Sequence, residues 1–374
     1  MNIYRQPWRL VQNRVRGEGG REIDKFRGII PPLDDECGSE AWVGSVTKAL
    51  GANDLNPTGC AEVLLPDGRK EYLYRVIEEN PEEILGAKHI ECNGYDLGLL
   101  VKLLDAKESF ALEAHPTRAV AKELWNSEYG KEESWYILGT REDTEEPAYV
   151  YLGFKEGVTA EIFSRYYEDR DMEALENLCH KIRVKKGDIF MIGAGLPHAL
   201  GAGCLALEVQ EPSDVGVTPL PQSELAAYYA SCGCEMKWDT EEVYKEKILK
   251  TFIFEGRKKT SNEEKWHIPE RIIRKGVWGK ETILIGPEQT SYFSYTKLDI
   301  YDSEVIDIYQ TGFPQIAIVI DGKGVFQYNG GEMEVKKADE IFLPYNIPGA
   351  RIKGNVSIIF CHPEGALKNI NKRI

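Results

Sequence analysis

The chain has 374 residues, 42% of them hydrophobic, and a formal net charge of −15. A surface this acidic repels phosphate backbones, which argues against a nucleic-acid partner. The start of the chain lacks the apolar core of a signal peptide, and no apolar run reaches the about 20 residues of a membrane span. We therefore expect a soluble, cytoplasmic protein that does not associate with membranes, long enough for two domains.

The eight cysteines are scattered along the chain. In a cytosolic protein this spread argues against a disulfide framework. Cys232 and Cys234 form the one close pair, but a second Cys or His pair at zinc-finger spacing is missing. We expect them to be ordinary reduced thiols.

Short segments punctuated by Gly and Pro predict many short strands, for example 61–74, 145–154 and 204–211. Helical patterns are fewer. They cover 117–129 after Pro116, two short stretches within 159–180, and the region 222–252. The charged stretch 255–266, EGRKKTSNEEKW, reads as an exposed connection.

A weak internal repeat suggests how these strands are organised. Residues 184–198 read VKKGDIFMIGAGLPH, and 335–349 read VKKADEIFLPYNIPG, aligned without a gap. Each copy predicts a polar turn, a short strand and a Pro-bounded bend. The run before and through the second copy, 313–344, predicts strands separated by an Asp-Gly turn and an Asn-Gly-Gly turn, as in an antiparallel jelly roll.

We therefore expect two related β-barrels. At the fifteenth place of the repeat, the first copy has His198 and the second has Gly349. This difference predicts that a site in the first barrel is missing from the second.

Metal-binding residue types occur at strand-like spacing in the first half. Glu113 and His115 are two residues apart, so they share one face of a strand. Lys131 and Glu133 have the same spacing. With His198, two imidazoles and two carboxylates suit Zn²⁺ or another divalent first-row ion. Taken alone, Glu133 reads rather as a surface carboxylate and His198 as a hydrogen-bonded core residue.

Three segments in this order resemble the class I, zinc-dependent mannose-6-phosphate isomerases of the cupin superfamily: VKLLDAKESFALEAHP, GKEESWY and GLPHALGAGCLALEVQEPSD. The resemblance is strongest over about 85–215. It implies a mainly β fold of two cupin (jelly-roll) barrels with a helical insertion. The implied domains are a catalytic-type cupin domain (1–217), a helical insertion and connection (218–275), and a cupin-like domain without metal ligands (276–374).

Carried over position by position, the resemblance implies one Zn²⁺ per chain. Its ligands would be Glu113, His115, Glu133 and His198. The implied catalytic residues are Lys102, Lys131 and Glu208.

The implied reaction interconverts mannose 6-phosphate and fructose 6-phosphate through a cis-enediolate. Its difficult step removes a proton next to a carbonyl, and the developing charge needs a metal or cation nearby. Glu208 is the candidate general base, with His115 or a metal-bound water as alternatives. Lys107 and Ser109, in the turn AKES, are candidates for binding the sugar phosphate, or else ordinary polar turn residues. The oligomeric state does not follow from the sequence.

Two positions depart from the family pattern. Glu113 stands where the family usually has Gln, which adds a negative charge and should weaken the Lewis acidity of the ion. Thr218 stands where the family has an Arg thought to face the sugar, and Thr cannot supply a cation. A second hypothesis is therefore a metal-bearing sugar-binding or regulatory cupin with lost or altered isomerase activity. A compensating cation could come from the N-terminal segment, whose arginines are Arg14, Arg16 and Arg21.

Overall fold

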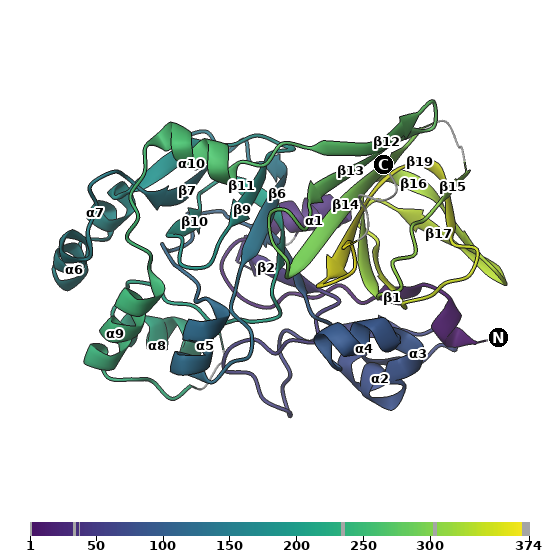
Figure 1. Cartoon of the computed structure of the whole chain (residues 1–374), viewed down its shortest axis with the longest axis horizontal. Coiled ribbons are helices and arrows are strands. Elements are labelled where there is room, and N and C mark those ends of the chain that lie inside the picture. The colour runs from purple at the N-terminus through teal and green to yellow at the C-terminus, as the bar shows by residue number, and fades with distance from the viewer. Residues whose placement is uncertain (1, 33–34, 37, 233–235, 302–304, 369–374) are drawn as a thin grey trace.

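The computed structural model describes residues 2–32, 35–36, 38–232, 236–301 and 305–368. Within these residues the strands form three sheets (Figure 1). A five-stranded sheet has the order β2 (Glu40–Val43), β5 (Leu100–Asp105), β11 (Cys204–Gln210), β6 (Glu133–Thr140) and β9 (Ile189–Ile192). A three-stranded sheet has the order β10 (His198–Leu200), β7 (Tyr149–Phe154) and β8 (Cys179–Arg183).

The third sheet has eleven strands and curls round its own core. Its main order is β12 (Arg271–Gly276), β13 (Gly279–Ile285), β14 (Phe293–Ile300), β19 (Arg351–Pro363), β16 (Gln315–Tyr328), β18 (Glu340–Leu343), β1 (Trp8–Leu10), β3 (Glu62–Leu64) and β4 (Lys70–Tyr72). Off this path, β15 (Val305–Asp307) pairs with β19 and β17 (Gly331–Lys336) with β16. The prediction of a mainly β, antiparallel fold with a helical insertion is confirmed.

The N-terminal strands belong to the sheet of the C-terminal part. Strand β1 pairs with β18, where Trp8 lies opposite Phe342, and on its other edge with β3. Trp8 and Phe342 are more than 300 residues apart in the chain, and local pattern carries no signal for such pairing. The domain boundaries 1–217, 218–275 and 276–374 stay a prediction. The pairing of β1 shows in addition that the start of the chain contributes a strand to the second barrel.

The repeat forms the same turn in both barrels. Asp188 accepts a hydrogen bond from the backbone N–H of Lys185 at 2.9 Å, and Asp339 accepts one from Lys336 at 3.1 Å. The residue before each Asp has a positive φ, +94° at Gly187 and +69° at Ala338. Strands β9 and β18 then follow. The predicted turn-and-strand unit is therefore confirmed in both copies.

Helices lie outside the barrels. The predicted helical regions contain α5 (Arg118–Trp125), α6 (Ala160–Glu168), α7 (Met172–Asn177), α8 (Gln222–Ser231) and α9 (Glu241–Thr251). Side chains of Thr117, Thr159, Asp171 and Thr240 cap the first turns of α5, α6, α7 and α9. Not predicted were a short 3₁₀ turn (Ile3–Arg5) and four helices, α1 (Arg21–Arg27), α2 (Leu73–Glu79), α3 (Pro81–Leu85) and α4 (Ala87–Asn93).

Two local predictions were wrong. The charged stretch 255–266 contains a helix, α10 (Lys259–Trp266), whose one buried residue, Asn262, donates to the backbone carbonyl of Leu152 at 3.2 Å. Tertiary contact thus stabilises a helix that its charged sequence did not indicate. Asp321-Gly322 is not a turn, because β16 runs through it with a shift in register against β19. The Asn-Gly-Gly turn is confirmed between β16 and β17.

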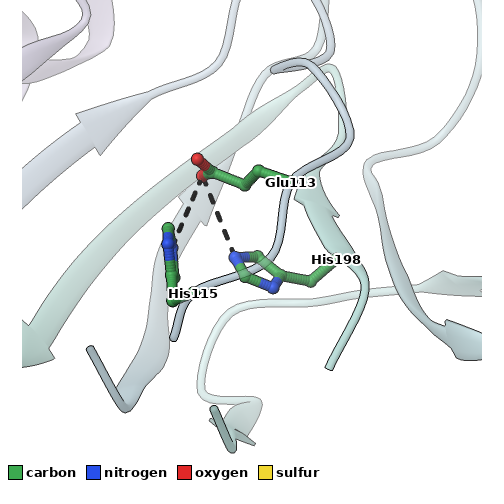
Figure 2. A group of neighbouring side chains, drawn as sticks. All are labelled: Glu113, His115 and His198. Carbon is green, nitrogen blue, oxygen red and sulfur yellow. Dashed lines mark ion pairs between the residues drawn. The ribbon is translucent and has the colours of Figure 1, made fainter. Parts of the chain in front are cut away.

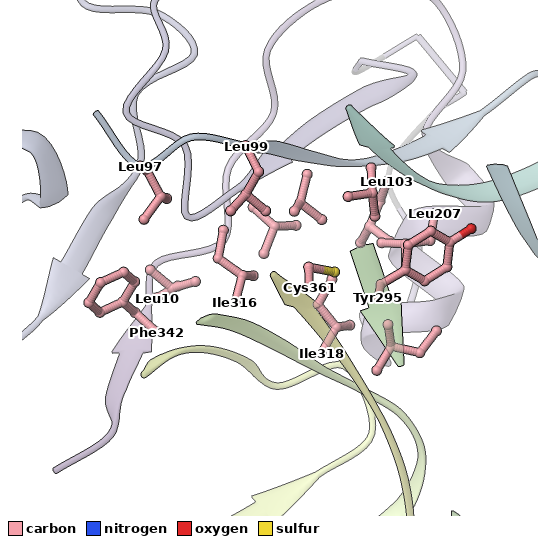
Figure 3. Close-up of a cluster of buried hydrophobic side chains, with 14 of the residues drawn as sticks. Leu10, Leu97, Leu99, Leu103, Leu207, Tyr295, Ile316, Ile318, Phe342 and Cys361 are labelled. Carbon is pink, nitrogen blue, oxygen red and sulfur yellow. The ribbon is translucent and has the colours of Figure 1, made fainter. Parts of the chain in front are cut away.

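The five-stranded sheet separates two cores. Figure 3 shows one of its faces, with Leu103 and Leu207, packed against Tyr295, Ile316 and Ile318 of the eleven-stranded sheet. The other face looks into the first barrel, where apolar residues of the five-stranded sheet meet those of the three-stranded sheet. Because side chains alternate along a strand, Lys102 and Glu208 point to this second face. The inside of the first barrel therefore receives the candidate site residues.

None of the described helices is both long and apolar enough to cross a membrane. Of the close cysteine pair, Cys234 lies outside the described residues.

Candidate metal centre

Backbone pairing brings Glu113 beside His198. The two residues form an antiparallel bridge, in which the Glu113 N–H donates to the His198 carbonyl at 2.9 Å and the His198 N–H returns the bond at 3.0 Å. His115 follows two residues later, on the same side as Glu113. The period-two spacing of Glu113 and His115 and the turn before Pro197 thus place three side chains in one spot.

Four predicted ligand residues converge there. Figure 2 shows Glu113, His115 and His198 pointing toward one another, with Glu113 Oε1 3.8 Å from the Nε2 atom of each histidine. One ligand atom from each of these three residues lies within 4.8 Å of the others. Glu133, at the start of β6, completes the group: its Oε2 is 3.1 Å from His115 Nε2 and its Oε1 3.2 Å from His198 Nε2. We call these four residues the ligand group.

The surroundings orient His198 as a metal ligand. Its Nδ1 donates to the backbone carbonyl of Leu196 at 2.8 Å, so the ring in its neutral form carries the proton on Nδ1 and turns the Nε2 lone pair toward Glu133. The ring also packs edge-on against Trp135, with centroids 5.6 Å apart. A fixed tautomer with Nε2 turned inward is the arrangement that divalent metals use.

The ligand group fits a divalent cation. His198 and Glu133 are completely buried, and within the described structure His198 Nε2 and both Glu133 oxygens have no hydrogen-bond partner. Buried polar atoms are rarely left in this way, and a metal ion would satisfy all three. Two imidazoles and carboxylate oxygens are a donor set that suits Zn²⁺.

Lys131 contributes the nearest cationic side chain. Its Nζ lies 2.7 Å from His115 Nε2 and 3.1 Å from Glu133 Oε2. Burial and then the Lys131 charge lower the pKa of His115 to about 4, which leaves this imidazole neutral, as a metal ligand must be. Burial alone would raise the pKa of Glu133, but its neighbours, above all the Lys131 charge, lower that pKa well below its ordinary value.

A buried ion pair lies farther along the same barrel face. Lys102 on β5 and Glu208 on β11 are cross-strand partners, with Lys102 Nζ 3.0 Å from Glu208 Oε1. Trp135, the partner of Glu208 on β6, donates its indole N–H to Glu208 Oε2 at 2.9 Å. Burial raises the pKa of Glu208, and the negative charge of Glu133 adds to this effect. The carboxylate of Glu208 is thus held from both neighbouring strands, by Lys102 on β5 and by Trp135 on β6.

The two predicted phosphate-binding residues are not brought to this spot by any described contact. Ser109 donates its hydroxyl to the carbonyl of Phe110 at 3.1 Å. Lys107 is half-buried beside Gly19, in the loop after β5. Their role in binding a substrate stays a prediction.

The backbone of Thr218 is hydrogen-bonded to the side chain of Tyr244. The Tyr244 hydroxyl accepts from the Thr218 N–H at 3.1 Å and donates to the Thr218 carbonyl at 3.0 Å. Of the three N-terminal arginines, Arg14 bonds to Asp24 and Gly38, and Arg21 pairs with Asp143 near the surface. Arg16 differs, because it lies mostly covered between two carboxylates.

Sequence reasoning missed those two carboxylates. Arg16 binds Asp214 through two hydrogen bonds of 2.7 Å and Glu40 through one of 2.9 Å. Glu40 in turn has an oxygen 3.8 Å from Lys102 Nζ. These residues lie 24 and 198 positions from Arg16, and no motif or spacing signals contacts over such separations.

Gly216 leaves space for the ring of His115. A Cβ atom at position 216 would lie 2.7 Å from His115 Nδ1, closer than real Cβ atoms approach. We expect Gly216→Ala to displace this ring and weaken zinc binding by about 10-fold or more, measured by titration with a competing chelator. Gly139→Ala is the matched control, because its Cβ would meet only Leu205 Cδ2 at 3.9 Å and neither glycine has a positive φ. Equal zinc affinity in the two variants would contradict the packing argument.

Comparisons with known proteins agree with this geometry. Residues 282–363, in the second barrel, match the family described as mannose-6-phosphate isomerase, cupin domain. Mannose-6-phosphate isomerase ManA of Bacillus subtilis is 28% identical over 264 residues, which cover 71% of this chain and 74% of the relative.

Solved structures show the same fold over nearly the whole length. The crystal structure of the mannose 6-phosphate isomerase from Bacillus subtilis superposes with a TM-score of 0.72 at 24% identity, covering 95% of this chain and 99% of that one. A zinc-bound mannose 6-phosphate isomerase gives a TM-score of 0.68 at 15% identity, covering 96% and 99%. The chain therefore has the fold of these isomerase structures, and its second barrel matches the cupin domain of the mannose-6-phosphate isomerase family.

Proposed function

We propose that this chain is a zinc-dependent aldose–ketose isomerase that interconverts mannose 6-phosphate and fructose 6-phosphate. The observation that carries the proposal is the buried ligand group beside the Lys102–Glu208 pair, on one face of one cupin barrel. The match of the second barrel to the mannose-6-phosphate isomerase cupin domain supports the same activity, and so do the relatives, which are named for it.

In this proposal Glu113, His115, Glu133 and His198 hold one zinc ion. The ion would stabilise negative charge that develops on the sugar oxygens during the reaction. Glu113 differs from the other three, because its side chain is about one-third exposed and it lies farther from the two imidazoles. We assign Glu113 to the open side of the site, where the sugar enters.

Glu208 is the general base of the proposal. Isomerisation moves a proton from C-2 of the aldose to C-1 through a cis-enediolate, and one carboxylate can take the proton and return it. Burial raises the pKa of Glu208, which brings its basicity nearer to neutral pH. Lys102, 3.0 Å away, keeps the carboxylate in place and supplies positive charge to the sugar oxygens.

Lys131 supplies a second positive charge at the ligand group. Burial opposes its charged form, but Glu133 and Glu113 raise its pKa, so the ammonium is retained inside the barrel. The site thus keeps cations although position 218 is a threonine. This favours an active isomerase over the alternative of a cupin that binds metal and sugar without catalysis.

The test is direct. Zinc-loaded protein should convert mannose 6-phosphate to fructose 6-phosphate and back, chelation should stop turnover, and added zinc should restore it. In D₂O, recovered aldose should carry deuterium at C-2. A panel of other aldose and ketose phosphates separates this substrate from a different sugar phosphate. Zinc-loaded protein that shows neither turnover nor deuterium exchange with either sugar phosphate would overturn the proposal.

A further inference from the structure

We propose that Arg16 is a positioning residue for this reaction, acting on Glu208 through Glu40 and Lys102. The inference rests on the proposed function, because it concerns the placement of the general base. It is carried by a continuous row of buried charged groups that runs from the N-terminal loop into the barrel.

The row begins with the hydrogen bonds of Arg16 to two carboxylates. Its Nη1 and Nη2 each donate to one oxygen of Asp214 at 2.7 Å, and its Nε donates to Glu40 Oε1 at 2.9 Å. The side chain is 10% exposed. Asp214 also accepts from the backbone N–H of Leu50 at 2.8 Å, which anchors it to the main chain. A guanidinium held on three of its nitrogens cannot rotate away.

The second contact joins Arg16 to the site lysine. The remaining oxygen of Glu40, Oε2, accepts from the indole N–H of Trp42 at 3.0 Å and lies 3.8 Å from Lys102 Nζ. Lys102 is closer to Glu208, at 3.0 Å. The ammonium therefore lies between two carboxylates and is shared unequally, with the shorter distance on the side of the general base.

Aromatic rings enclose these charges. The Arg16 guanidinium lies 5.6 Å from the ring centre of Trp42 and 5.8 Å from that of Tyr229 on α8. Lys102 Nζ lies 5.1 Å from the Trp42 ring. Because the rings limit water, the groups must balance one another's charge. Three carboxylates (Glu40, Asp214 and Glu208) face two cations, Arg16 and Lys102.

This balance gives Arg16 its role. With Arg16 present, most of the Glu40 charge is satisfied by the guanidinium, so Lys102 stays on Glu208. Without it, Glu40 becomes a buried carboxylate with little compensation, and Lys102 is the nearest cation that can move toward it. Such a movement would leave the general base misplaced and its charge unbalanced, which lowers turnover more than substrate binding.

The experiment compares Arg16→Gln, Glu40→Gln and the double variant, all zinc-loaded. We expect Arg16→Gln to lower kcat by about 10- to 100-fold with KM changed less than threefold. Glu40→Gln alone should cost less, because it removes the competitor of Glu208 for Lys102. The kcat of the double variant should be at least threefold higher than that of Arg16→Gln. A purely structural role would make the two substitutions add to each other's damage.

Arg141→Gln is the matched control. Arg141 is also buried, with paired hydrogen bonds of 2.7–2.8 Å to Asp35 and Asp105, yet it contacts neither Lys102 nor Glu208 in the described structure. It should lower the melting temperature while kcat per folded molecule is unchanged. The ¹⁵N-labelled indole N–H of Trp42 gives a readout independent of activity. This signal should shift in Arg16→Gln and stay in place in Arg141→Gln.

The outcomes separate the two proposals. A wild-type protein without turnover overturns the proposed function and, with it, this role. An active wild type whose Arg16→Gln variant is folded, binds zinc and keeps its kcat overturns the positioning role alone. A double variant whose kcat is no higher than that of Arg16→Gln also overturns the positioning role.

Discussion

Replacing His198 with alanine should remove the bound zinc and lower kcat by about 1,000-fold or more. His198 Nε2 faces Glu133 inside a completely buried site. Losing this imidazole leaves one histidine and two carboxylates, whereas catalytic zinc sites normally have at least two His or Cys ligands. Without the ion, several kcal/mol of charge stabilisation in the transition state are lost, which corresponds to this range of rates. Zinc content by elemental analysis and turnover of mannose 6-phosphate check the two parts.

His180→Ala is the control for His198→Ala. His180 is also buried and lies on β8 of the same three-stranded sheet, where its Nε2 donates to the backbone carbonyl of Arg257 at 2.7 Å. Its removal should lower the melting temperature but leave one zinc ion bound. The fold should tolerate the change at 198, since His198 lies in strand β10 and its backbone bonds to Glu113 do not depend on the side chain. A His198→Ala protein that retains stoichiometric zinc would contradict the assignment of this ligand.

Replacing Glu208 with glutamine should lower kcat by about 100- to 10,000-fold while the zinc stays bound. Glutamine has nearly the same shape but cannot accept the substrate proton. Glu208 is not a member of the ligand group, so the metal content should be unchanged. KM should change only a few-fold. Turnover, zinc content and deuterium exchange at C-2 in D₂O are the measurements, and exchange should fall together with kcat.

Glu211→Gln separates catalysis from stability. Glu211 lies three residues farther along and is also buried. Its ion pair with Arg118, at 2.6 Å, and its bond from the Glu132 N–H, at 3.2 Å, resemble the buried contacts of Glu208. Its loss should destabilise the protein without a comparable fall in kcat per folded molecule. If Glu208→Gln keeps more than a tenth of the wild-type kcat, another group is the base, and His115 is then the first to examine.

Much of the candidate metal centre follows from local pattern. Glu113 and His115 are two residues apart in extended chain, and His198 comes directly after a Pro-bounded bend that the repeat makes recognisable. Such features depend on the backbone period and on turn chemistry, which act over a few residues. The convergence of Glu133 with them came from resemblance and not from spacing, because no local rule relates separate strands of a barrel.

The row Arg16–Glu40–Lys102–Glu208 could not be predicted in this way. Arg16 and Glu40 read as ordinary charges in the sequence, with Arg16 on an exposed loop, and only the resemblance pointed to Lys102 and Glu208. Their pairing depends on the bridge between Arg16 and Glu40 and on the register of β2, β5 and β11. The helix at 259–266 was missed for a related reason, since packing of Asn262 and Trp266 stabilises it more than its own composition does.

The sequence by itself determined the local units of this protein: the repeated Lys-Lys-x-Asp turns, the short strands, the capped helices and the residue types of a metal site. Only the tertiary structure decided that β1 completes the second barrel, that Lys102 is shared between Glu40 and Glu208, and that Arg16 is held by Glu40 and Asp214. The physical reason is the distance along the chain over which each interaction acts. Turns, caps and side-chain alternation are set by neighbouring residues, whereas burial and charge balance depend on groups that folding brings together from distant parts of the chain.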